Sequence, residues 1–157
     1  MVKVLAISST GGHWVQLLRL MPAWDGCEVH YACTSRDHEA RVRALADARG
    51  TPAAGYHPIT DANRWAKMKL VKQMLEVGAL IAKVRPDVII TTGASAGYFA
   101  IRFGKLLGAR GCWLDSIANA QELSLSGLKA GPHAELWLTQ WPEVARETGP
   151  QYKGAVL

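Results

Sequence analysis

Short runs of apolar residues alternate along the chain with longer segments in which apolar residues recur every three or four positions. The short runs predict strands at 2–8, 28–33, 53–57, 87–91, 111–115 and 136–139. The longer segments predict helices at 14–21, 36–48, 64–84, 96–107 and 123–130. Strands that alternate with helices indicate βαβ units and a mostly parallel sheet. We therefore expect an α/β fold with a doubly wound, Rossmann-like sheet in a single domain over residues 1–157.

Composition narrows the class of protein. The 157 residues are 49% hydrophobic and 20% charged, which is ordinary for a globular domain. The first seven residues carry one cation and a short apolar run, so they predict a strand rather than a signal peptide, and we expect a cytoplasmic protein. The cysteines form no C-x-x-C pair, the histidines are scattered and no D-x-D motif occurs. Buried free thiols and the absence of a metal site are the expectation.

The net charge of +5 draws the chain towards anions, and one segment concentrates the cations. The start of the predicted helix 64–84 interleaves cations with large apolar side chains: Arg64, Trp65, Lys67, Met68, Lys69 and Lys72. This mixture suits the headgroup region of an anionic membrane. A solvated helix face is the alternative. Nucleic acid is not expected as a partner, because no known binding motif accompanies the charge.

Polar and small residues follow the predicted strands, where ligands bind in sheets of this type. Ser9, Thr10, Gly11, Gly12 and His13 come after the first strand and lead into a helix. Two glycines allow a sharp turn, and the N-terminus of the following helix attracts phosphate. His13 can accept a proton from a hydroxyl or hydrogen-bond a phosphate. A plain tight turn with an exposed histidine is the alternative.

Two later strand ends carry similar candidates. Thr92, Gly93, Ala94 and Ser95 form a second small-residue turn into a helix, which holds the other side of the same ligand or allows close helix–strand packing. Asp115 and Glu122 flank a polar loop after the fifth strand. Either carboxylate is a candidate base or sugar ligand, and either is equally a candidate helix cap.

Five motifs occur in an order that resembles a known family: S-T-G-G-H from Ser9, R-P-D-V-I-I-T-T-G from Arg85, E-L-S-L-S-G from Glu122, Q-W-P from Gln140 and Y-K-G from Tyr152. Together they are similar to the membrane-anchoring subunit of the split N-acetylglucosaminyltransferase of dolichol-linked oligosaccharide assembly. They are also similar to the bacterial PssD-type subunits of capsular and exopolysaccharide synthesis. The resemblance covers nearly the whole chain.

The resemblance implies the N-terminal, acceptor-side half of a GT-B glycosyltransferase, similar to the N-terminal domain of MurG. A separate small subunit would bind the UDP-sugar donor, so no cofactor is expected on this chain. Gly11, Gly12 and His13 would meet the diphosphate of a lipid-linked glycan acceptor, and Thr92, Gly93 and Ala94 would line the opposite wall. The chain begins at its first strand, whereas the eukaryotic members carry a transmembrane anchor. That departure favours a bacterial member bound peripherally to the inner face of the cytoplasmic membrane.

The expected reaction is an inverting sugar transfer to a hydroxyl of the acceptor. His13, or failing that Asp115 or Glu122, would remove the proton. The rival hypothesis is a non-catalytic scaffold that recruits a catalytic subunit to the membrane. A self-sufficient nucleotide-binding enzyme is a third possibility, although the chain carries neither a G-x-G-x-x-G nor a Walker A motif.

Overall fold

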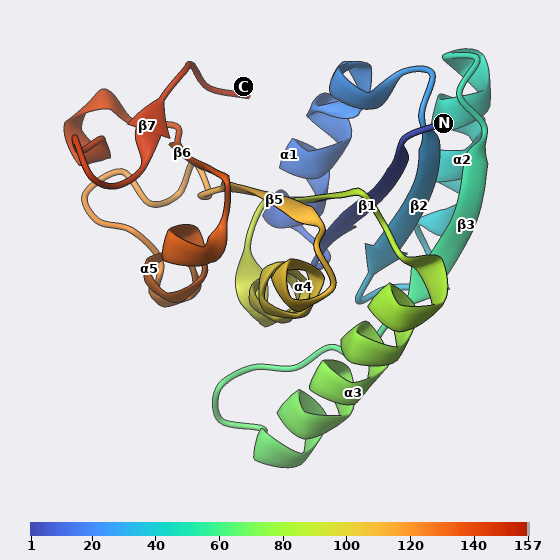
Figure 1. Cartoon of the computed structure of the whole chain (residues 1–157), viewed down its shortest axis with the longest axis horizontal. Helices are drawn as coiled ribbons and strands as arrows, with labels where there is room; N and C mark the ends of the chain where they lie inside the picture. The colour runs from blue at the N-terminus through green and yellow to red at the C-terminus, as the bar shows by residue number, and fades with distance from the viewer. Residues whose placement is uncertain (157) are drawn as a thin grey trace.

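The computed structural model describes residues 1–156 and contains a single sheet of seven strands in the order β3-β2-β1-β4-β5-β6-β7 (Figure 1). All neighbouring strands are parallel. The strands are β1 (Lys3–Ser8), β2 (Glu28–Cys33), β3 (Ala53–Pro58), β4 (Val88–Thr91), β5 (Arg110–Leu114), β6 (Leu136–Thr139) and β7 (Gln151–Tyr152). The strand order reverses between β1 and β4, which defines the point where ligands bind in doubly wound sheets.

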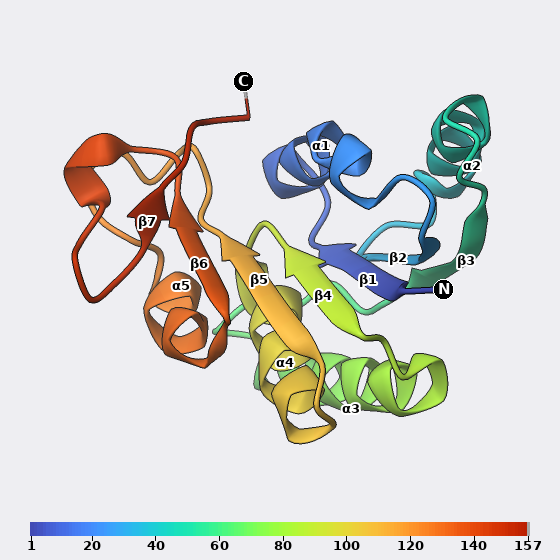
Figure 2. The same ribbon diagram turned by 45° about the horizontal axis from the view of Figure 1, so that its top comes forward.

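Helices cover both faces of the sheet. Figure 2 shows α1 (Gly12–Arg19) and α2 (Glu39–Ala48) on one face, and α3 (Lys67–Val84), α4 (Ala94–Leu106) and α5 (Leu125–Ala130) on the other. Three short 3₁₀ helices, η1 (Met21–Trp24), η2 (Gly131–His133) and η3 (Pro142–Val144), complete the elements. The predicted α/β doubly wound fold is confirmed.

The central strand β1 explains why the sheet needs cover on both faces. Its alternate side chains Val4 and Ala6 join one apolar cluster with residues of α1 and α2. Leu5 and Ile7 join the other cluster with residues of α3 and α4. Each of these four side chains is at most 3% exposed. A strand buried on both faces therefore reads as a continuous apolar run in the sequence.

The starts of all five predicted helices differ from the sequence-based expectation. Helix α1 begins at Gly12 rather than residue 14, so His13 lies in its first turn. Helix α2 begins at Glu39 rather than residue 36. Helix α4 begins at Ala94 rather than residue 96, and α5 begins at Leu125 rather than residue 123. Helix α3 begins at Lys67 rather than residue 64, because the Asn63 side chain accepts hydrogen bonds from the backbone N–H groups of Trp65 and Ala66 and holds a turn there.

The cysteines were expected to be buried free thiols, but only Cys33 is buried, while Cys27 and Cys112 are half-buried. All three cysteines, which lie within the described residues, are free thiols. Burial raises the pKa of the Cys33 thiol and raises that of Cys112 to about 11, so both are poor nucleophiles. Among residues 1–156, no helix combines the length and the apolar character needed to span a bilayer.

Candidate functional site

The two small-residue turns meet at the point where the strand order reverses. The Nδ1 atom of His13 hydrogen-bonds the backbone carbonyl of Thr92 at 2.8 Å. The Thr92 hydroxyl in turn donates to the backbone carbonyl of His13 at 2.6 Å. Because β1 and β4 are parallel neighbours, their carboxyl ends bring these two residues together from 79 positions apart. The two turns therefore lie side by side at this edge of the sheet, and the expectation that they hold two sides of one ligand stays a prediction.

Gly93 makes room for the His13 ring. Its backbone has φ of +130°, and a Cβ atom built there would lie 2.7 Å from Cε1 and 2.8 Å from Nδ1 of His13. A side chain at this position would therefore displace the imidazole. Gly11, with φ of +82°, gives the first turn its left-handed residue just before α1.

The hydrogen bond to Thr92 fixes the tautomer of His13. A carbonyl oxygen only accepts, so the Nδ1 atom must carry the hydrogen. In the neutral ring the lone pair then lies on Nε2, which is free to accept a proton from a bound hydroxyl. This is the arrangement that a general base needs.

A hollow of about 290 Å³ opens beside His13. It is lined by first-turn residues of α1 and α4, by the β5–α5 loop and by the start of α5: His13, Ala94, Ser116, Ala118, Asn119, Ser124, Leu125 and Ser126. Within residues 1–156, no side chain caps the start of α1 or of α4. The backbone N–H groups of both first turns thus remain available to donate hydrogen bonds to an anion that binds there.

The buried Asp115 side chain holds the β5–α5 loop that lines this hollow. The residue is 1% exposed, and its two carboxylate oxygens receive four hydrogen bonds. The donors are Nε1 of Trp113, Nδ2 of Asn119, and both the backbone N–H and the hydroxyl of Ser124. A Cβ at Gly127 would lie 2.6 Å from this carboxylate, which explains the glycine in the S-L-S-G motif. The geometry favours a positioning role for Asp115 over proton transfer.

The other predicted polar residues do not belong to the described lining of this hollow. The Thr10 hydroxyl hydrogen-bonds His38 at 2.7 Å, and the Ser95 hydroxyl donates to Gln73 at 2.6 Å. Ser9 is half-buried, and its backbone carbonyl accepts from the Ser8 hydroxyl. Glu122 is exposed on the β5–α5 loop and does not belong to the described lining of the hollow. Their predicted roles stay predictions.

Sequence reasoning missed a buried amide pair that holds the same loop. Gln16 and Gln140 are 4% and 2% exposed, and the Gln140 amide donates to Oε1 of Gln16 at 2.5 Å and to the Asp115 carbonyl at 3.0 Å. Oε1 of Gln16 also accepts from the backbone N–H of Ile117. Gln140 was visible only as part of the Q-W-P motif, and the polar residue Gln16 within the apolar spacing of α1 was the other available signal.

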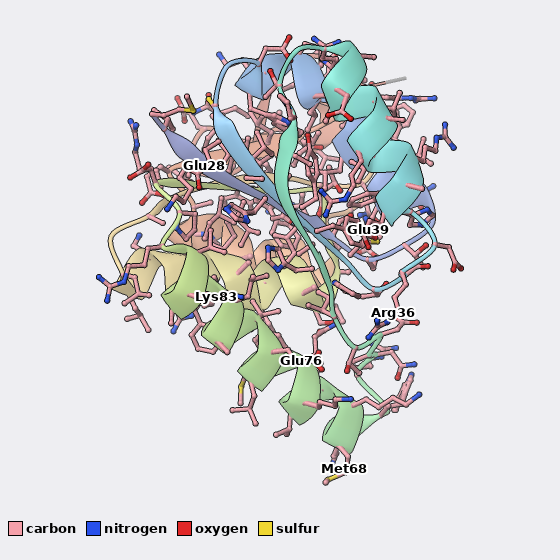
Figure 3. The ribbon with its side chains drawn as sticks, turned by 90° about the vertical axis from the view of Figure 1, so that its right-hand side faces the viewer. Glu28, Arg36, Glu39, Met68, Glu76 and Lys83 are labelled. Atoms are coloured by element: carbon pink, nitrogen blue, oxygen red, sulfur yellow. The ribbon has the colours of Figure 1, made fainter. Side chains whose placement is uncertain are left out.

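The predicted membrane-surface residues lie together at the start of α3. Trp65 is 79% exposed and Met68 is 84% exposed. The Arg64 guanidinium lies 4.7 Å from the Trp65 ring centroid. Figure 3 shows Met68 at one end of α3 and Lys83 towards the other. Large apolar side chains exposed among cations are the composition of an interfacial surface.

Two sequence relatives bear the name UDP-N-acetylglucosamine transferase subunit ALG14. The chain is 34% identical to that of Yarrowia lipolytica over 74 residues, which is 43% of this chain and 34% of the relative. It is 25% identical to that of Eremothecium gossypii over 166 residues, which covers 91% of this chain and 74% of the relative. The chain matches no known family model.

Solved structures share the fold. The crystal structure of Acinetobacter baumannii MurG superposes with a TM-score of 0.72 and 16% identity, over 97% of this chain and 45% of MurG. A UDP-N-acetylglucosamine 2-epimerase from Rickettsia bellii gives a TM-score of 0.68 with 11% identity, over 99% of this chain and 45% of the epimerase. The chain therefore spans less than half the length of these proteins, and its fold corresponds to the N-terminal half of the GT-B architecture.

Proposed function

We propose that this chain is the acceptor-side subunit of a two-chain inverting glycosyltransferase. It binds a lipid-diphosphate-linked glycan at a membrane surface, while a separate chain binds the UDP-sugar. The proposal is supported above all by the similarity to ALG14 subunits, which in the Eremothecium gossypii protein extends over 91% of this chain. The names of both relatives favour N-acetylglucosamine as the sugar. Neither relative bears on the bacterial exopolysaccharide setting, which stays a prediction.

The residues around His13 would bind the acceptor and remove its proton. Nε2 of His13 removes the proton from the acceptor hydroxyl as the sugar is transferred from the donor. The uncapped first turns of α1 and α4 hold the acceptor diphosphate through backbone N–H groups. Asn119 and Ser124 lie in the hollow and are oriented by the Asp115 carboxylate. Asp115 is thus a positioning residue, and the partner chain stabilises the leaving UDP.

The membrane role rests on the exposed surface formed by the turn before α3 and the first turn of α3. Trp65 and Met68 would enter the headgroup region while the neighbouring cations attract anionic lipid. A chain held in this way meets a lipid-linked acceptor without leaving the surface. We place the protein on the cytoplasmic side of the membrane as part of the same proposal.

The test is reconstitution of the transfer reaction. A tagged copy is isolated from its native membranes, and the chains that co-purify are identified and expressed singly. Transfer of radiolabelled sugar from UDP-N-acetylglucosamine to a lipid diphosphate glycan is then assayed with each chain alone and with both together. The proposal predicts transfer only with both chains present. If this chain alone transfers sugar as fast as the two chains together, donor and acceptor are not bound by different chains. If the partner alone does so, this chain is a scaffold.

A further inference from the structure

A second hollow, of about 470 Å³, lies between the β3–α3 loop and the helices α3, α4 and α5. It shares Ala94, Leu125 and Ser126 with the hollow beside His13, so the two hollows are adjacent. We refer to the larger hollow as the apolar groove. Its apolar side chains come from three helices, namely Leu70, Tyr98, Phe99 and Leu125.

The far end of the apolar groove reaches the proposed membrane surface. Asn63 and Arg64 line it there, and they immediately precede the exposed Trp65. A path therefore leads from the His13 hollow, along apolar side chains, to the residues proposed to enter the headgroup region. An amphiphile with its anionic head at His13 would lay its hydrocarbon along this path.

The charges of the apolar groove suit such an amphiphile. Its described lining residues include two cations, Arg64 and Lys129, and no acid. Lys129 is exposed on α5, and no ion pair is formed by either cation among residues 1–156. Unpaired cations beside aromatic and aliphatic side chains complement a phosphate joined to a hydrocarbon chain.

We propose that the apolar groove binds the first hydrocarbon units of the lipid phosphate, so that this part of the tail is drawn out of the bilayer onto the protein. The proposal rests on the proposed function, since it takes the acceptor to be a lipid diphosphate. It assigns the groove to lipid rather than to a protein partner. The affinity for a lipid diphosphate then depends on chain length even when no membrane is present.

The experiment measures binding of methyl, geranyl and farnesyl diphosphate to the ¹⁵N-labelled chain in membrane-free solution by NMR. All three probes should shift the amide signals of Gly11 to His13. Geranyl and farnesyl diphosphate should also shift those of Tyr98 and Phe99. Affinity should rise about 10-fold or more from methyl to geranyl, because buried CH₂ groups contribute additively. Leu70→Gln should abolish most of this gain and leave methyl diphosphate affinity unchanged.

Leu75→Gln is the matched control, because Leu75 lies on the same helix, is 63% exposed and does not belong to the described lining of the groove. It should leave all three affinities unchanged. Affinity that does not depend on chain length would overturn the groove proposal while the diphosphate site stands. Loss of partner assembly in Leu70→Gln without a chain-length effect would also overturn it, in favour of a protein interface. If no probe shifts Gly11 to His13, the diphosphate site of the proposed function fails instead.

Discussion

His13 and Thr92 bind each other twice, through the imidazole Nδ1 and the Thr92 carbonyl and through the Thr92 hydroxyl and the His13 carbonyl. This pair joins the turn after β1 to the turn after β4 and holds the ring in one orientation. Because Nδ1 donates, the Nε2 lone pair faces away from the Thr92 carbonyl. The pair therefore links the two turns and also leaves Nε2 of His13 available as a base.

Removing the imidazole should remove the base. His13→Ala should lower the turnover of the assembled complex by about 10²–10⁴-fold, the usual contribution of a general base. His133→Ala is the control, since that ring contacts Arg102 at the surface. Steady-state transfer rates on the two variants decide the matter. Turnover that survives His13→Ala undiminished would take His13 out of the mechanism, and turnover that also survives substitution of Asp115 and Glu122 would support the scaffold hypothesis.

Displacing the ring without removing it should have a similar effect. Gly93→Ala places a methyl group 2.7 Å from the His13 ring and also strains a backbone with φ of +130°. Gly108→Ala also places a side chain on a backbone of positive φ, +84°, but its added Cβ meets no described atom within 4 Å. Both variants should lose about 1 kcal/mol or more in the free energy of unfolding. Only Gly93→Ala should also lose at least 10-fold in turnover; equal activity in the two would contradict the role of the His13 orientation.

Asp115 should behave as a structural acceptor. Asp115→Asn turns one of its acceptor oxygens into a donor that opposes the groups now bound to it, so we expect a loss of about 1–3 kcal/mol in the free energy of unfolding. Urea denaturation measures this loss. Glu122→Gln, an exposed change on the same loop, should stay within about 0.5 kcal/mol of the unaltered protein. A fully stable Asp115→Asn with turnover as low as that of His13→Ala would make Asp115 the base.

Membrane attraction should depend on which end of α3 is altered. Replacing Lys67 and Lys69 with glutamine should weaken binding to anionic vesicles about 30-fold at low salt, since each cation near the surface contributes about 1 kcal/mol. The control replaces Lys83 and Arg85, exposed cations at the other end of the helix, with glutamine. Vesicle sedimentation compares the two. Equal losses would indicate attraction by net charge rather than by a defined surface.

The sequence predicts the sheet well and the site only in outline, for physical reasons. Strands such as β1 are continuous apolar runs, and glycine turns reveal where they end. The contact between Gln16 and Gln140 joins residues 124 positions apart, and no local pattern encodes it. The four donors around Asp115 come from β5 and the β5–α5 loop, within nine positions of it, but the sequence does not show which way this polar loop folds, so the burial of Asp115 could not be separated from a catalytic role by its position alone. Helix starts shifted where a side chain such as Asn63 competes for the backbone.

The central claim is that donor and acceptor are bound by different chains. Calorimetric titration of this purified chain with UDP and with several UDP-sugars tests it most directly. The account predicts no binding below millimolar concentration, because the donor site belongs to the partner. Micromolar binding of one UDP-sugar would contradict it and would place the donor site on this chain.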